Sequence, residues 1–89
     1  MVDEEKRKRI QIALWAYAYE IMNDPIVPDG VYDGVSHSID TSISTGDEEM
    51  DNWFKENFVA DTGQWIHTYP HLDKLKKKYD LLKQTGEKK

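Results

Sequence analysis

The sequence contains no cysteine, so it can form no disulfide framework, no thiolate metal site and no catalytic thiol. It has no apolar run approaching the roughly 20 residues of a membrane-spanning helix, so we expect no membrane association. No basic segment followed by an apolar leader stands at its start, and we expect a cytoplasmic location. Its 89 residues suffice for one small domain, whose core must rest on the aromatic side chains that form 11% of the chain.

Basic residues are scarce in the middle of the chain. Residues 20–61 contain eleven acids and one base, Lys55, whereas residues 66–89 contain seven bases and three acids. Because nucleic acids are bound by neutralising phosphates with Lys and Arg, we expect no direct binding of nucleic acid by the acidic segment. Two interpretations stay open: a solvated face that favours solubility, or a surface that docks on a cationic protein.

Apolar residues recur at helical spacing in the first half of the chain. The spacing predicts a helix over about residues 4–23, ended by Pro25, and a short helix over residues 29–33 with Asp29 as its N-cap. Residues 36–45 have no strong period, and we expect them to be irregular.

The second half predicts two further helices. Residues 45–48 fit a capping box for a helix that places Met50, Trp53, Phe54 and Phe58 on one face. A turn is predicted at residues 61–63, and a short extended segment is predicted at residues 65–69. A last helix is predicted from residues 68–70 to about Gly86. We therefore predict an all-α fold, a single domain over residues 1–89 with three or four helices, frayed over 1–5 and 84–89.

The first helix has apolar side chains on two sides. Only the arc that holds Ala13 and Ala16, with Glu20 and Asn23, looks compatible with water. We expect one apolar stripe to form the core and the other to meet a host protein or a second copy of the chain. The first stripe is Ile10, Leu14, Tyr17 and Ile21, and the candidate interaction stripe is Ile12, Trp15, Tyr19 and Met22.

The densest cluster of polar and aromatic groups follows this helix. Tyr19 lies near the helix end and Tyr32 on the first turn of the next helix, so a proline-stiffened loop can bring the two rings together. Facing aromatic rings suit a planar, cationic ring. Asp29 and Asp33 are four residues apart and can accept hydrogen bonds from ribose hydroxyls. A capping aspartate and core tyrosines are the simpler alternative.

This segment resembles the N-terminal Ia domain of bacterial NAD-dependent DNA ligases. In that family a helix ends in Tyr-x-Tyr-His, a proline loop follows, and Asp-x-x-Tyr-Asp opens the next helix. The resemblance implies that NMN or NAD is the ligand. It also implies a cofactor-binding role for Tyr19, Asp29, Tyr32 and Asp33. Glu20 replaces the family histidine, and an acid there would favour the nicotinamide cation but repel the NMN phosphate.

The chain departs from the ligases in the residues that carry their chemistry. Neither Asp29-Gly30 nor Asp33-Gly34 has a lysine two residues earlier, so the Lys-x-Asp-Gly nucleophile is missing. We therefore expect a non-enzymatic binding module that requires no cofactor, of the kind that phages and prophages encode. The alternative is an interaction protein that modulates a host, as a DNA mimic or anti-defence protein, through its acidic surface.

Histidine spacing gives little reason to expect a metal. His67 and His71 are four residues apart, but Pro70 lies between them and no further ligand is near in sequence. We expect no metal site.

Overall fold

The computed structural model describes the backbone of residues 2–87 and the side chains of residues 4–83. Within that part the chain forms four α-helices, one 3-10 helix and no strand, which confirms the all-α prediction. No helix there is both long and apolar enough to cross a membrane. Fraying at residues 1–5 and 84–89 stays a prediction, and the side chains of 84–89 lie outside those described. The elements are α1 (Val2–Glu20), α2 (Asp29–Ser38), α3 (Glu48–Asn57), η1 (Gln64–Thr68) and α4 (Leu72–Glu87).

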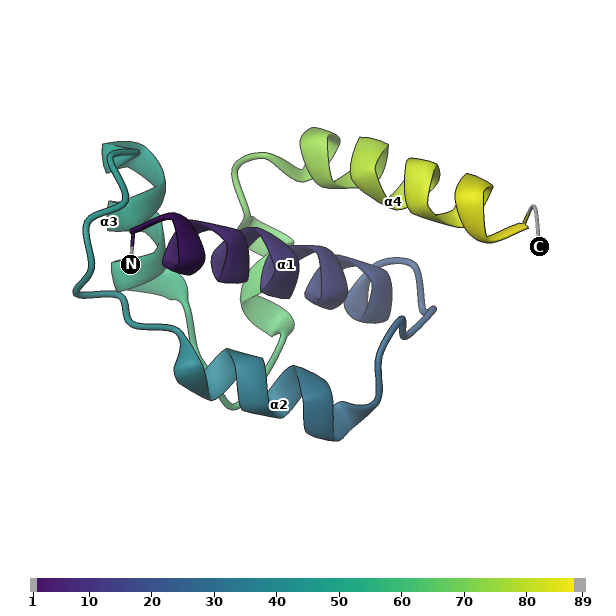
Figure 1. Ribbon diagram of the computed structural model, residues 1–89, viewed down its shortest axis with the longest axis horizontal. Helices are drawn as coiled ribbons and strands as arrows, with labels where there is room; N and C mark the ends of the chain where they lie inside the picture. Colours follow the sequence, from purple (N-terminus) through teal and green to yellow (C-terminus); the bar gives the residue numbers. More distant parts are fainter. Residues whose placement is uncertain (1, 88–89) are drawn as a thin grey trace.

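Helix α1 is the central element of the fold. In Figure 1 it runs through the middle of the molecule, with α4 along one side and α2 along the other. Helix α3 lies near the N-terminal end of α1, and η1 packs directly against α1. The C-terminal half of α1 therefore lies close to both α2 and η1.

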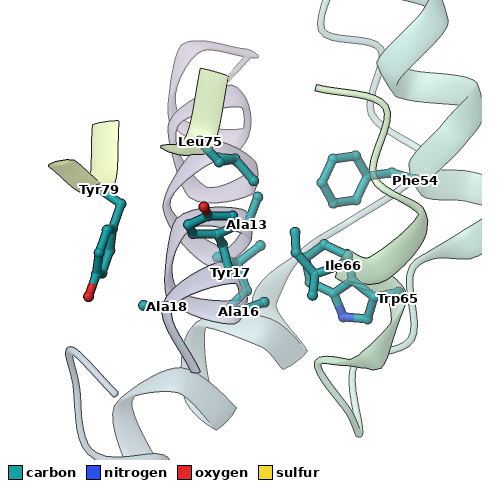
Figure 2. Packing of buried hydrophobic residues seen from close by; sticks show 10 residues of the cluster. Ala13, Ala16, Tyr17, Ala18, Phe54, Trp65, Ile66, Leu75 and Tyr79 are labelled. Atoms are coloured by element: carbon teal, nitrogen blue, oxygen red, sulfur yellow. The ribbon is translucent and has the colours of Figure 1, made fainter. Parts of the chain in front are cut away.

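The core lies where one face of α1 meets α3, η1 and α4 (Figure 2). Ala13 and Ala16 are 0% and 1% exposed, so the prediction that their arc faces water is wrong. These small side chains let η1 and α4 approach α1 closely, which a larger residue would prevent. The buried apolar residues are Ile12, Ala13, Ala16, Tyr17, Ala18, Phe54, Trp65, Ile66, Leu75 and Tyr79.

The two predicted apolar stripes of α1 do not coincide with its buried face. Ile12 is 0% exposed, so its predicted role in an interaction surface is wrong, because no partner can reach it. From the same stripe, Tyr19 and Met22 are 53% and 41% exposed. In the stripe assigned to the core, Tyr17 is buried but Ile21 is exposed.

Helix α1 ends at Glu20, three residues earlier than predicted. Asn23 adopts a left-handed conformation with φ of 53°, which asparagine tolerates better than most residues. The Asp24 amide then donates to the Ala18 carbonyl at 2.8 Å, which satisfies one carbonyl of the last turn. The chain is thus turned toward α2 before Pro25.

Helix α2 is twice as long as predicted, since it continues through residues 34–38. Pro28, not Asp29, is its N-cap, and Asp29 stands in the first turn. The predicted irregularity of residues 36–45 is therefore wrong for its first three residues. Ser36 explains part of the difference, because its hydroxyl is buried and donates to the Ala60 carbonyl at 2.8 Å. This bond ties α2 to the segment that follows α3.

Helix α3 begins one residue after Asp47, whose side chain accepts from the Met50 amide at 3.3 Å. The capping box predicted at Thr45 is therefore wrong. The Thr45 hydroxyl donates instead to Asp51 at 2.6 Å. Phe54 is buried on the predicted apolar face of the helix.

Residues 64–68 form the 3-10 helix η1, not the extended piece that the sequence predicts. The Ile66 amide donates to the Gly63 carbonyl at 3.1 Å, which closes the first turn. This turn buries Trp65 and Ile66 together, whereas an extended strand would place neighbouring side chains on opposite faces. Helix α4 follows and contributes Leu75 and Tyr79 to the core.

Candidate functional site

A cavity of about 590 Å³ lies at the C-terminal end of α1. Its volume is in the range of small-molecule sites. All five residues that the sequence predicts as cofactor-binding line it, so residues up to fourteen positions apart in the chain are brought together. The lining residues are Trp15, Ala16, Tyr19, Glu20, Pro25, Ile26, Val27, Asp29, Gly30, Tyr32, Asp33, Asp61, Thr62 and Gly63.

Three aromatic side chains line this cavity. Tyr19 is exposed, while Trp15 and Tyr32 are partly buried and pack against the core. The sequence assigns Trp15 to a docking stripe, but the structure places it beside the two tyrosines. The aliphatic side chains of Ile26 and Val27, from the loop before α2, add an apolar wall.

The Tyr32 hydroxyl lies beside the 62–63 turn. It lies 3.5 Å from the Thr62 carbonyl oxygen, a long hydrogen bond. Burial raises the pKa of Tyr32 to about 12, and the Glu20 carboxylate adds to the rise, while the Trp65 indole N–H opposes it. The phenol is therefore neutral throughout the physiological range and can donate a hydrogen bond.

Four carboxylates line the cavity, and histidines partner three of them. His37 Nε2 lies 3.4 Å from both Asp33 Oδ1 and Asp61 Oδ1, so one imidazole bridges α2 and the segment before η1. His67 Nε2 lies 3.5 Å from Glu20 Oε1. These imidazoles carry charge only when they are protonated.

The sequence did not assign residues 61–63 to the site. It predicts a turn there but gives no reason to place that turn beside Tyr32, thirty residues earlier. Gly63 is the one sequence feature that is consistent with a close approach of this turn to Tyr32, since a Cβ at this position would lie 3.2 Å from the Tyr32 hydroxyl. It would also lie 3.4 Å from Glu20 Cγ. A glycine therefore lets the turn close one side of the cavity.

No metal site is found near these groups. Among residues 4–83, no group of three or more His, Asp or Glu side chains is arranged to hold a metal ion. His71, the second histidine of the predicted pair, lies 3.2 Å from Glu49 and not beside His67's partner Glu20.

A second charged cluster lies at the opposite end of α1. Arg9 Nε donates to Glu5 at 2.9 Å and Arg9 Nη1 to Asp51 at 2.7 Å. Arg9 Nη2 donates to the carbonyls of Asp40 and Ile43 at 2.9 and 3.0 Å. Both Arg9 and Glu5 are buried. The cluster fixes the connection between α2 and α3 on α1.

This cluster changes the interpretation of the acidic segment. The Thr45 hydroxyl holds the pKa of Asp51 below its ordinary value, with a further contribution from Arg9. Asp51 therefore serves inside the molecule as a partner of Arg9. Asp51 is therefore not part of an open acidic surface.

Comparison of the chain with protein-family models, with curated proteins and with solved structures finds no match. The resemblance to the ligase Ia domain thus rests on the residues of the 17–33 segment.

Proposed function

We propose that this protein is a non-catalytic binding module whose cavity takes a ligand with a nicotinamide ring joined to ribose, such as NMN or NAD. One observation carries the proposal. Tyr19, Asp29, Tyr32 and Asp33, to which the resemblance to the ligase Ia domain gives a ligand-binding role, line a single cavity of about 590 Å³ together with Glu20, which replaces the family histidine. The proposal places its action in the cytoplasm, or in the host cytoplasm if a phage encodes it.

The cavity chemistry agrees with a pyridinium ring. The faces of Tyr19 and Tyr32 attract a flat cation through their quadrupoles, and Trp15 adds a third aromatic surface. Because burial raises the pKa of Tyr32 to about 12, the phenol is neutral near pH 7, adds no charge and can donate to a ligand oxygen.

The acidic groups suit the ribose. Asp29 and Asp33 lie on one side of α2 and line the cavity with Glu20. Ionised carboxylates are strong acceptors for hydroxyl groups and favour a nearby positive ring.

The proposal includes binding without a reaction. The proposal rests on the missing Lys-x-Asp-Gly nucleophile of the ligases, and it assigns to the carboxylates and tyrosines that line the cavity a binding role only. Tyr19 in the cavity wall is 53% exposed, so a bound ligand would remain partly in contact with water. We therefore expect micromolar or weaker affinity, because much of the surface of the ligand stays in water.

Calorimetric titration of the full chain with NMN, NAD and nicotinamide riboside tests the proposal. Tyr19→Ala should weaken binding at least several-fold, since this exposed ring can be removed without opening the core. Met22→Ala is the matched control, because Met22 is exposed near the same helix end but does not line the cavity. Absence of heat for all three ligands at millimolar concentration would overturn the proposal.

An interaction protein is the second candidate. Ile21 and Met22 are exposed apolar residues that follow α1, and the neighbouring segment is acidic. Such a patch suits a cationic protein or a second copy of the chain. Sedimentation of the chain at high concentration, with Met22→Asp as the variant, tests self-association. Pull-down of host proteins, again with Met22→Asp as the variant, tests a partner, because Met22 is exposed and does not line the cavity. A monomer that captures no protein would rule this function out.

A further inference from the structure

The cavity carries an imbalance of charge. Glu20, Asp29, Asp33 and Asp61 all line it, and among residues 4–83, whose side chains are described, no lysine or arginine does. A phosphate group is normally held by Lys, by Arg or by free backbone amides. The lining therefore attracts a positive ring but offers no side chain of fixed positive charge to a phosphate.

The groups that could hold an anion near the cavity already have acidic neighbours. His37 lies between Asp33 and Asp61, 3.4 Å from each carboxylate, and His67 lies 3.5 Å from Glu20. A phosphate would have to displace a carboxylate from either imidazole or stand beside one.

The N-terminus of α2 is a poor anion site because an acidic side chain stands in its first turn. Asp29 stands in its first turn and brings its own negative charge there. The amides of Val31 and Tyr32 both donate to the Pro28 carbonyl, at 3.0 and 3.2 Å. The attraction of the helix dipole for a phosphate is thus opposed by a side chain of the same helix turn.

We propose that the cavity prefers nicotinamide riboside, the cationic nucleoside without phosphate, over NMN and NAD. This inference rests on the proposed function and specifies its ligand class. The pyridinium charge is common to all three compounds, so the aromatic rings and the ribose acceptors serve each of them. The phosphates differ, and in NMN and NAD they bring negative charge toward four carboxylates.

Titration of the unaltered full chain with nicotinamide riboside, NMN and 1-methylnicotinamide tests the preference. We expect the riboside to bind about tenfold more tightly than NMN at low salt, which corresponds to a few like-charge contacts at partial exposure. The ratio should fall at high salt, because screening weakens repulsion between exposed charges. The comparison of low with high salt uses only the unaltered chain, so it cannot be confused with a folding defect of a variant.

A charge variant locates the effect in the cavity. Glu20→Gln combined with Asp61→Asn should reduce the preference for the riboside several-fold, chiefly by improving NMN binding. Asp73→Asn on α4 is the matched control, since it removes an acid that does not line the cavity, and it should leave the ratio unchanged. Circular dichroism of each variant verifies that it is folded.

The outcomes separate this inference from the proposed function. Binding of NMN as tight as that of the riboside, or tighter, overturns the preference and leaves the proposed function standing. Binding of 1-methylnicotinamide but not of the riboside overturns the preference for the riboside, and it also overturns the proposed function, which requires a ribose on the ring. Absence of binding for every pyridinium compound overturns both.

Discussion

The two ends of α1 carry the same kinds of side chain, carboxylates beside aromatic rings, in opposite settings. At the N-terminal end, Glu5 and Asp51 bind the Arg9 guanidinium, which stacks 5.5 Å from the Phe54 ring centroid. At the C-terminal end, the carboxylates line a cavity with aromatic walls, and none of the described side chains that line it is an arginine.

The difference separates structural from functional charge. An acid that is buried with a cation within hydrogen-bond distance stabilises the fold, because its charge is satisfied inside the molecule. Acids that gather around a cavity with no fixed cation repel one another, and they favour a positive ligand. We therefore regard the Arg9 cluster as structural and the cavity as the place of the proposed binding function.

Removal of Arg9 should have the largest effect. Arg9→Ala leaves Glu5 and Asp51 without their shared cation, and we expect a loss of about 3 kcal/mol or more in the free energy of unfolding. Arg7→Ala, at an exposed position of the same helix, should change it by less than about 0.5 kcal/mol. Urea denaturation measures both. Equal losses would mean that the cluster does not stabilise the fold.

The environment of Tyr32 is the next test, at the cavity end. Because burial raises the pKa of Tyr32 to about 12 from 10.0, its neutral form is favoured in the folded state. The folded chain therefore loses stability as the pH rises above about 10, where the unfolded chain releases this proton first. In ultraviolet titration, Tyr32→Phe should remove a tyrosinate step near pH 12.

Tyr69 provides an internal comparison for that titration. Burial also raises the pKa of Tyr69 to about 12, with a contribution from Asp47, yet Tyr69 does not line the cavity. Glu20→Gln should lower the pKa of Tyr32 without moving that of Tyr69. If Tyr32→Phe instead removes a step near pH 10, the ring is solvated and the cavity is more open than described.

Acid should weaken the N-terminal cluster. The Asp51 carboxylate accepts hydrogen bonds from Thr45 and from Arg9, and these bonds lower its pKa from the ordinary value of 3.8. As the pH falls below about 3.8, the unfolded chain takes up the proton before the folded chain does, so stability is lost. Asp51→Asn should be less stable at neutral pH and should lose less stability on acidification than the unaltered chain. Parallel pH curves would show that this contribution is absent.

The helices could be predicted from the sequence because their apolar residues lie close together in the chain. The sequence did not predict which face of α1 is buried. The buried face includes two alanines, which add little to an apolar pattern, and the charged pair Glu5 and Arg9, which such a pattern assigns to water. Their burial depends on Asp51 and on backbone carbonyls of the 40–43 connection, far away in sequence.

The residues that line the cavity also fall into two groups, those that are close together in the sequence and those that tertiary packing brings in. Residues 19–33 form a local helix–loop–helix segment, so their spacing alone could place Tyr19 and Tyr32 together. Asp61 and Gly63 reach the cavity through tertiary packing, partly through the bond from Ser36 to Ala60. No local pattern in the sequence predicts that contact. His67 is likewise placed beside Glu20 only because residues 64–68 form a 3-10 turn.

Glu20 carries the smallest predicted effect, and it decides whether the ligase resemblance applies. If the cavity binds NMN, Glu20→His should tighten NMN binding several-fold, on the order of 1 kcal/mol, and more so at low salt, because one like charge beside the phosphate is removed. His67→Gln should do the opposite, since it removes the imidazole that partners the Glu20 carboxylate. If the chain acts instead through its acidic surface, Glu20→His should leave NMN binding undetected and slightly weaken binding to a cationic protein. Should neither property change, Glu20 is a solvated helix residue, and the ligand role of the ligase family does not extend to this chain.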